Sequence, residues 1–384
     1  MTTGVVRPNI PLIAEHDTWI TVDPLLGCPA SCDYCFLGAF FLRNRKPIEF
    51  SDPNLLLDEL NLYLSGREDS TPIALGNYTD MLMTPANRQY VASFVKRYAE
   101  SHPERPLVLI TKSRDIGNIP EVIAESGCRA VIFFSQSFAG ESGLGLESGP
   151  IADFQTTIKN IESVAALRSD KVVPVHFWRP FLSRLNNSAN LVNRVERLQK
   201  SGSRGSVVVG FKSRGFRQES WTPATSNLIT PNDIHYPGDE FFAEESWFLL
   251  AALGREMNYP ILRHTSCVIA ATQKVPDALR TWEGNQSTHY CLSTSCALPQ
   301  RKICRTASLI DVTIEQLNGA ANLLPVGALV DAYVVAGQVT TSVPIDEYTL
   351  NVASHVSGLR IRSKSVEPRK AWIGSVNEDW RLGS

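Results

Sequence analysis

The sequence predicts an α/β protein whose main part is a partial (β/α) TIM-type barrel. Two observations support this fold class. Short apolar segments alternate along the chain with amphipathic segments of helical length, which is typical of a parallel sheet covered by helices. Polar side chains also gather just after the apolar segments, where barrels of this kind have their active sites.

The elements alternate as strand and helix in chain order. A helix is predicted over 52–66, because Leu56, Leu60 and Tyr63 share one face, Pro53 suits a first turn and Gly66 can end it. Other amphipathic segments predict helices over 86–101, 118–126, 151–168, 187–202 and 239–258. Segments rich in β-branched and aromatic residues predict strands over 18–24, 71–77, 106–113, 129–137, 172–180, 206–213 and 259–267. Six or seven such units indicate a barrel or partial barrel.

After residue 267 this alternation stops. We therefore divide the chain into an N-terminal extension (1–17), a barrel (18–258) and a C-terminal domain (259–384). The loops 138–150 and 214–238 are rich in Gly, Ser, Pro and Asn and are candidate lids over the barrel.

Composition limits the classes of partner. The chain has 384 residues, 43% of them hydrophobic, and a formal charge of −2, which does not favour nucleic acid as a partner. Its first residues lack the apolar segment of a secretory signal, and its apolar runs are shorter than the ~20 residues that cross a bilayer. We expect a cytoplasmic protein without a membrane partner.

Residues 27–36, GCPASCDYCF, place three cysteines in the loop after the first predicted strand. Structural zinc normally takes four ligands, a disulfide would leave one thiol over, and an iron–sulfur cluster with one open iron needs three thiolates. The position in the first βα loop favours the cluster. Tyr34 also favours it, since its ring would lie against a bound planar ligand.

The segment CPASCDYC resembles the C-x3-C-x-aromatic-C signature of the radical S-adenosylmethionine superfamily. The resemblance implies a [4Fe–4S] cluster on Cys28, Cys32 and Cys35 whose open iron chelates S-adenosylmethionine. It implies reductive cleavage to a 5′-deoxyadenosyl radical, which abstracts a hydrogen atom from an organic substrate. The implied electron donor is a flavodoxin or ferredoxin.

The segments GNYTDMLMTP, LITKSRD and IFFSQS, on successive predicted strands, are similar to the spore photoproduct lyase-like branch over roughly 18–213. This similarity implies that the polar residues at these strand ends contact S-adenosylmethionine. With neighbours in the same motifs, the expected cofactor-binding residues are Tyr34, Asn77, Thr79, Asp80, Lys112, Ser135 and Ser137. The alternative is that they are strand-end caps and surface ion pairs.

One departure concerns the hydrogen donor. The branch carries a donor cysteine before its TSD-like stretch, whereas GNYTD has none, so thymine-dimer repair by the same mechanism is not expected. Tyr78 is the alternative donor. In HFWRP, alternation puts Phe177 and Arg179 on one face, and Arg179 is expected either to bind a carboxylate or phosphate or to form a structural ion pair.

A second cysteine group follows the barrel. Cys267, Cys291, Cys296 and Cys304 would hold an auxiliary [4Fe–4S] cluster, with structural zinc and unpaired buried thiols as alternatives. Cys128 matches neither group and is expected to be a small buried apolar residue.

We therefore expect a radical S-adenosylmethionine enzyme with a C-terminal auxiliary-cluster domain and a small-molecule or nucleotide-like substrate. The outcome after hydrogen abstraction (epimerisation, dehydrogenation, bond formation or lyase chemistry) stays open. The alternatives are a nucleic-acid repair or modification enzyme of the spore photoproduct lyase type and a non-catalytic iron–sulfur or zinc sensor or scaffold.

Overall fold

The computed structural model describes residues 10–186, 188–212, 223–236, 240–277, 295–308, 312–329, 332–335, 338–341, 343–363 and 366–367. Its centre is an eight-stranded sheet in the order β1-β2-β6-β7-β8-β10-β11-β15. The strands are β1 (Ile13–Glu15), β2 (Ile20–Val22), β6 (Ile73–Leu75), β7 (Leu107–Thr111), β8 (Ala130–Gln136), β10 (Val172–Trp178), β11 (Ser206–Val208) and β15 (Ile261–Leu262).

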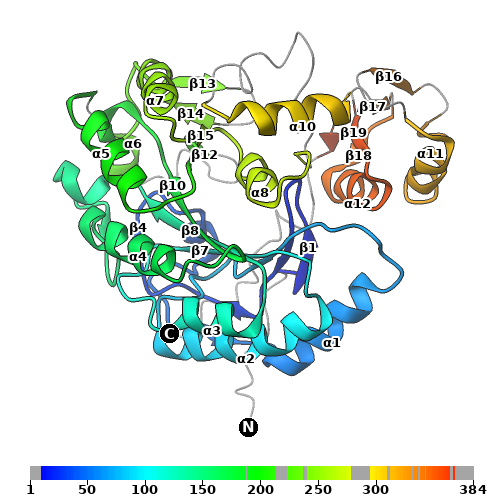
Figure 1. The fold of residues 1–384 in the computed structure, drawn as a ribbon, viewed down its shortest axis with the longest axis horizontal. Helices are drawn as coiled ribbons and strands as arrows, with labels where there is room; N and C mark the ends of the chain where they lie inside the picture. Colours follow the sequence, from blue (N-terminus) through cyan, green and yellow to red (C-terminus); the bar gives the residue numbers. More distant parts are fainter. Residues whose placement is uncertain are drawn as a thin grey trace.

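The strands from β2 to β15 all pair in parallel, and only β1 runs antiparallel to its neighbour. Helices connect them in chain order: α1 (Pro53–Leu64), α2 (Pro85–Ser101), α3 (Ile119–Ser126), α4 (Phe154–Ala166), α5 (Ser188–Lys200) and α7 (Glu244–Glu256). Figure 1 shows α1 to α5 arranged along the outer side of the curved sheet. The predicted α/β class and partial barrel are confirmed.

Local sequence explains where α1 begins. Asp52 precedes the helix in an extended conformation, and its Oδ1 accepts hydrogen bonds from the backbone N–H groups of Asn54 and Leu55. Pro53 occupies the first turn, where its missing N–H costs no helical hydrogen bond. Leu56 and Leu60 are then buried against the sheet, as their spacing predicts.

The two faces of the sheet carry separate apolar clusters. On β8, Ile132 and Phe134 belong to the outer cluster between the sheet and the helices, whereas Val131 and Phe133 belong to an interior cluster. Alternation along a strand therefore directs the odd-numbered side chains of β8 to the interior face. The residues that follow them on this face, beginning with Ser135, line the interior at the carboxyl end.

Two predicted elements are wrong in type. The start of the predicted helix 239–258 is a strand, β14 (Glu240–Phe242), which pairs with β12 (Phe211–Lys212) and β13 (Ile234–Tyr236). The predicted strand 259–267 is the short β15 followed by α8 (Thr265–Gln273). Pairing with strands distant in the sequence overrides local propensity in the first segment. In the second, extended His264 ends the strand and starts the helix, so Cys267 lies on a helix.

The sheet extends past the limits of 18 and 258 expected for the barrel, because β1 lies before the first and β15 after the second. Further elements in the C-terminal half are α6 (Pro223–Ser226), α10 (Leu298–Ser308), α11 (Ile314–Ala321), β16 (Tyr333–Val335), β17 (Gln338–Thr341), β18 (Ile345–Asp346), α12 (Glu347–Ser357), β19 (Arg360–Ser363) and β20 (Val366–Glu367). Elements from α11 to β19 share an apolar cluster of their own. Treating 259–384 as a separate domain stays a prediction.

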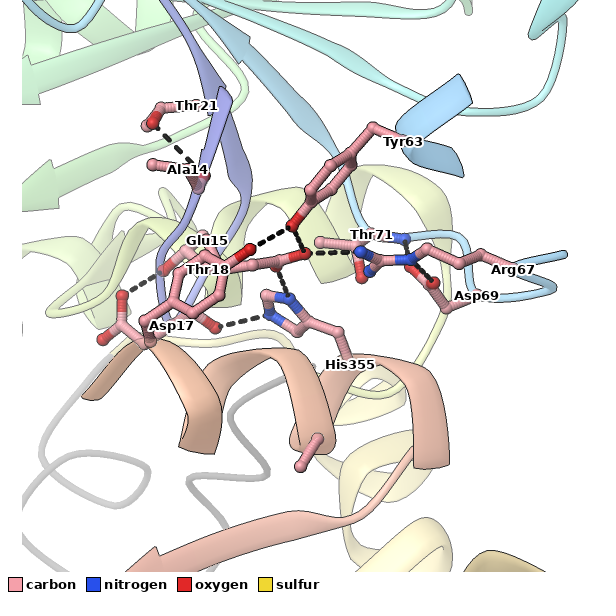
Figure 2. A network of polar contacts seen from close by, with 12 residues as sticks. Ala14, Glu15, Asp17, Thr18, Thr21, Tyr63, Arg67, Asp69, Thr71 and His355 are labelled. Carbon is pink, nitrogen blue, oxygen red and sulfur yellow. Dashed lines mark hydrogen bonds and ion pairs between the residues drawn. The ribbon is translucent and has the colours of Figure 1, made fainter. Parts of the chain in front are cut away.

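A buried polar network ties α12 to the first strand of the sheet (Figure 2). Glu15 on β1 is fully buried and accepts a hydrogen bond from Tyr63 Oη at 2.8 Å. Its carboxylate also pairs with Arg67 and lies within hydrogen-bond distance of His355 Nδ1 on α12. This network fixes α12 to the edge of the barrel, and His355 Nε2 adds a contact with the carbonyl of Asp17 at 3.3 Å.

Among the helices in the described part of the chain, none is both long and apolar enough to cross a membrane.

Candidate active site

The loop with the first three cysteines begins where β3 (Leu25–Leu26) ends. Gly27 has φ of 108°, and a Cβ there would lie 3.2 Å from the carbonyl oxygen of Lys46, so glycine lets these segments approach. The N–H of Cys28 donates to the carbonyl of Leu42 at 2.8 Å. The cysteines thus follow the first parallel strand, as predicted.

A second segment supports the loop from across the barrel. The strand β4 (Ser31–Cys32) pairs antiparallel with β9 (Glu147–Ser148), which places Cys32 opposite Glu147. The N–H of Asp33 donates to the carbonyl of Leu146 at 2.9 Å. Arg43 pairs with Asp33 at 3.2 Å and donates to its backbone carbonyl at 3.0 Å. The backbone of the cysteine loop is therefore held on two sides.

The thiols of this loop are free and lie in apolar surroundings. Cys28 and Cys32 are buried in one cluster with Leu26 and Leu42, and Cys35 packs against it. Burial raises the pKa of Cys28 to about 12, and the nearby charge of Asp80 adds to the shift. Burial also raises the pKa of Cys32 and of Cys35. Without metal the thiols are protonated, and metal binding would release these protons.

The donor set fits an iron–sulfur cluster, since thiolates from one loop in a dry environment are its usual ligands. Within the described ranges, no group of three His, Cys, Asp or Glu side chains could hold a metal ion. That observation concerns a single metal ion, which needs all its ligands at one point. A cluster differs, because each thiolate binds a separate iron.

A buried carboxylate beside the loop brings three of the predicted residues together. Glu147 Oε1 accepts hydrogen bonds from Lys112 Nζ and Ser137 Oγ, each at 2.8 Å, and from the hydroxyl of Tyr34. Lys112 Nζ also lies 5.7 Å from the centroid of the Tyr34 ring. Glu147 lies on β9, whereas Lys112 and Ser137 directly follow β7 and β8, and Tyr34 lies just after β4.

This group holds a charged pair in spite of its burial. Burial alone would raise the pKa of Glu147, but the ammonium of Lys112 and the hydrogen bonds lower it below its ordinary value. Burial likewise would lower the pKa of Lys112, yet Glu147 raises it. Burial raises the pKa of Tyr34, which therefore donates as a neutral phenol.

Asp80 lies at the end of β6 and bonds to neighbouring backbone. Its carboxylate accepts hydrogen bonds from Thr111 Oγ1 at 2.9 Å and from the backbone N–H groups of Lys112 at 2.7 Å and Leu82 at 3.0 Å. Burial raises its pKa although these donors act in the opposite direction. These contacts fix the ends of β6 and β7 together, and the role of Asp80 as a cofactor ligand stays a prediction.

The preceding turn, from Gly76 to Thr79, packs under the cysteine loop. Thr79 donates its hydroxyl to the carbonyl of Gly27, and the N–H of Tyr78 donates to Asp23 Oδ1 at 3.0 Å. The N–H of Asn77 donates to the same oxygen. The Tyr78 ring is buried edge-to-face against Phe36 and Phe40, with centroids 5.6 and 5.4 Å away.

Ser135 and Arg179 extend the interior face toward this site. Ser135 follows Phe133 on that face, and Arg179 follows Phe177, with its guanidinium carbon 5.7 Å from the centroid of the Phe177 ring. The expected shared face of Phe177 and Arg179 is therefore confirmed, and it is the interior face. His176 and Trp178 point to the outer side, where Trp178 joins the outer cluster.

The second cysteine group is described in part. Cys267 on α8 and Cys296 before α10 both pack against the interior cluster. Cys304 on α10 accepts hydrogen bonds from the N–H of Asp277 at 3.4 Å and from Gln300 Nε2 at 3.3 Å. Cys291 lies outside the described residues, so the auxiliary cluster stays a prediction. Cys128 is fully buried in the outer cluster, as expected.

Sequence reasoning missed Glu147, Asp23 and Arg43. Glu147 lies in the glycine-rich loop 138–150, where no periodic pattern marks a buried position. Its only signal is that it is an acidic residue a short distance after a strand end that carries Ser135 and Ser137. Asp23 directly follows the strand before the cysteines, a position that could have suggested a turn-stabilising carboxylate.

Together these features define a class of protein: a parallel α/β partial barrel with a buried cysteine loop at the carboxyl end of its first parallel strand. No protein-family model matches the chain, and no curated protein matches its sequence. The fold is similar to solved structures of spore photoproduct lyase.

The complex of that enzyme with dinucleoside spore photoproduct has a TM-score of 0.50 and 10% identity, covering 62% of this chain and 73% of that chain. A tyrosine-to-phenylalanine mutant has a TM-score of 0.50 and 12% identity, covering 65% and 78%. A cysteine-to-serine mutant has a TM-score of 0.50 and 10% identity, covering 66% and 77%. At this identity the likeness shows a shared fold.

Proposed function

We propose that the protein is a radical S-adenosylmethionine enzyme that acts on an organic, small-molecule or nucleotide-like substrate. One observation carries the proposal: three free cysteines of one loop lie in a shared apolar environment at the carboxyl end of a parallel sheet, beside the buried group of Tyr34, Lys112 and Ser137. The fold likeness to spore photoproduct lyase supports it. When bound, the [4Fe–4S] cluster and S-adenosylmethionine would supply a 5′-deoxyadenosyl radical that removes a hydrogen atom from the substrate.

The chain's own residues would divide the remaining work. Cys28, Cys32 and Cys35 would hold the cluster, because they are the thiols of the loop and lie among apolar side chains. The aromatic side chains packed around Tyr78 would keep water away from it. Tyr78 itself is our candidate for returning a hydrogen atom, since it lies in the same cluster as Cys28.

The cofactor would be bound by the polar strand ends. Ser135 and Ser137 offer hydroxyl groups on the interior face, and Tyr34 offers a partly buried ring that shares the Glu147 carboxylate with Ser137. Thr79 and Asp80 also hold the turn under the loop. The proposed cofactor-binding set is Tyr34, Asn77, Thr79, Asp80, Lys112, Ser135 and Ser137.

The C-terminal cysteines would hold an auxiliary [4Fe–4S] cluster on Cys267, Cys291, Cys296 and Cys304. The packing of Cys267 and Cys296 against the interior cluster supports a location facing the barrel. Such a cluster would accept or relay an electron from a flavodoxin or ferredoxin. Metal analysis of Cys296→Ala, which should retain the first cluster and lose the second, tests this assignment.

A nucleic-acid repair or modification enzyme of the spore photoproduct lyase type is the second candidate, because a solved structure of similar fold was determined with dinucleoside spore photoproduct. Salt-dependent binding of single-stranded or damaged DNA would support it. A non-catalytic iron–sulfur or zinc sensor is the third reading, and it predicts metal without cleavage of S-adenosylmethionine.

The test is formation of 5′-deoxyadenosine by anaerobically reconstituted protein with S-adenosylmethionine and a strong reductant. We expect slow formation in the wild type and none in Cys32→Ala. Cys128→Ala is the matched control, because this buried thiol lies in the outer cluster away from the loop. Formation in Cys32→Ala at the rate of the control would overturn the proposal, as would a cluster-loaded wild type that never cleaves the cofactor in the presence of cell extract as a source of substrate.

A further inference from the structure

Two cations follow strands β7 and β10, which flank β8 in the sheet, and both strands carry side chains of the interior cluster. Lys112 follows β7, on which Val108 packs in the interior cluster and Ile110 packs against it. Arg179 follows β10, on which Val175 and Phe177 pack in the same cluster. Their charges can therefore be compared as parts of one site.

The charge of Lys112 is already balanced. Its ammonium lies 2.8 Å from Glu147 Oε1, and the Glu147 side chain is only 7% exposed. A ligand carboxylate placed at Lys112 would have to lie beside that carboxylate, and two like charges at this distance repel strongly in a buried site. Lys112 is thus poorly suited to bind a second anion.

The charge of Arg179 has no such balance. In the ranges that the structure describes, no hydrogen bond or ion pair engages its guanidinium. Its cation–π contact there is with the Phe177 ring. Its backbone is fixed, since its N–H donates to the carbonyl of Gln136 at 3.0 Å. The side chain is half-buried, so an oxyanion can reach the guanidinium without displacing a counter-charge.

Glu240, a carboxylate whose charge acts on Arg179, is already satisfied. Glu240 affects the pKa of Arg179, but its carboxylate accepts hydrogen bonds from the N–H of Gly210 at 2.6 Å and from Lys212 Nζ at 3.2 Å. It also forms an ion pair with Arg263 at 3.3 Å. Glu240 therefore has its own cations, and an external anion can take the place opposite Arg179.

We propose that Arg179 binds an oxyanion, a carboxylate or phosphate, of the organic substrate and so selects anionic substrates. That the oxyanion belongs to a substrate rests on the proposed function, whereas the presence of an anion site at Arg179 does not. The guanidinium fork matches both oxyanions in a bidentate geometry. An oxyanion would approach Arg179 on the interior face, where the guanidinium lies against the Phe177 ring.

Binding of inorganic phosphate and of acetate to the full-length protein tests the site, measured by calorimetry with chloride at matched ionic strength. We expect saturable binding in the wild type, a loss of about tenfold or more in Arg179→Gln, and partial retention in Arg179→Lys, which keeps the charge but not the fork. Lys212→Gln is the matched control, since it removes a half-exposed cation already paired with Glu240. Equal binding by all four proteins, or none by the wild type, would overturn the proposal.

Two adenosine compounds distinguish the source of the oxyanion. S-adenosylhomocysteine carries the amino-acid carboxylate of the cofactor, and 5′-methylthioadenosine lacks it. We expect Arg179→Gln to bind both as the wild type does. A selective loss of S-adenosylhomocysteine affinity would assign the arginine to the cofactor and overturn the substrate assignment. Phosphate binding at Arg179 in a protein that never forms 5′-deoxyadenosine would leave the anion site standing and sink the proposed function alone.

Discussion

Glu147 Oε1 lies 2.8 Å from Lys112 Nζ although 35 residues separate them in the chain. The contact joins the loop after β8 to the end of β7, and the same loop pairs with the backbone of Cys32. One carboxylate therefore connects the cysteine loop, a cation and two neutral donors, Tyr34 and Ser137. The stability of this part of the barrel should depend on it.

Glu147→Gln is expected to destabilise the protein, because it leaves the Lys112 ammonium opposite a neutral amide. Removing one partner of a buried pair costs about 3–5 kcal/mol, and we expect the lower end because Lys112 keeps 16% of its exposure. Urea unfolding of the protein without metal measures the loss.

Lys112→Met completes a double-mutant cycle with Glu147→Gln. The double variant Glu147→Gln/Lys112→Met should be more stable than the sum of the single losses implies, because no uncompensated charge is left. Strict additivity of the two losses would show that the two side chains do not act as a pair.

Gly76→Ala should cost more than Gly66→Ala. Both glycines have positive φ, 82° and 73°, so each substitution places alanine in the left-handed region, at about 1–2 kcal/mol. A Cβ at Gly76 would also lie 2.2 Å from Met81 Cγ, whereas one at Gly66 meets nothing within 4 Å. The overpacking should add about 1–3 kcal/mol.

Thermal melting of both variants compares the two losses directly. Equal decreases in melting temperature would contradict the predicted clash with Met81.

Acidification should weaken the attachment of α12 to β1. Burial alone would raise the pKa of Glu15, but the partners His355 and Arg67 lower it below its ordinary value of 4.5. The unfolded chain therefore binds the proton more readily, so the carboxylate's contribution is complete above about pH 4.5 and is lost as pH falls through the lower, folded pKa.

Glu15→Gln removes this contribution at all pH values. The difference in unfolding free energy between wild type and variant should be constant near neutral pH and should shrink below about pH 4.5. Glu245→Gln, at an exposed position on α7, is the control and should show no such dependence. A wild-type advantage that grows on acidification would refute the direction of the shift.

His176 should make the barrel acid-sensitive at a higher pH. It is buried on β10, with Nδ1 3.0 Å from Ser206 Oγ, and burial, with Arg194 and Lys112 nearby, lowers its pKa to about 3. Between that value and 6.5 the unfolded chain binds a proton that the folded chain rejects, so stability falls as pH falls.

From pH 6.5 to pH 5 the loss should be about 2 kcal/mol. His176→Gln should flatten this part of the profile of unfolding free energy against pH. An unchanged slope in the variant would assign the acid sensitivity to other groups.

Sequence patterns predict the helices and parallel strands well because interactions between residues close in sequence determine them. Helix α1, for example, is specified by its Asp52 cap, by Pro53 in its first turn and by a regular apolar face. The segment at Glu240–Phe242 was mistaken for helix because its partners, β12 and β13, are defined only by the fold. The cysteine loop could be found since Cys28, Cys32 and Cys35 lie within eight positions of the sequence. Glu147 could not, because the burial of a single loop carboxylate depends on which distant cation and hydroxyls meet it.

The β4–β9 pairing has a consequence for metal loading. The cysteine loop is held by backbone hydrogen bonds to β9 and to the segment after it, so its shape does not depend on ions. Small zinc-binding domains, in contrast, fold only when metal arrives. If the loop holds the proposed cluster, removing the metal should leave this backbone arrangement in place, so a chelator should strip the protein of metal while its circular dichroism spectrum stays unchanged.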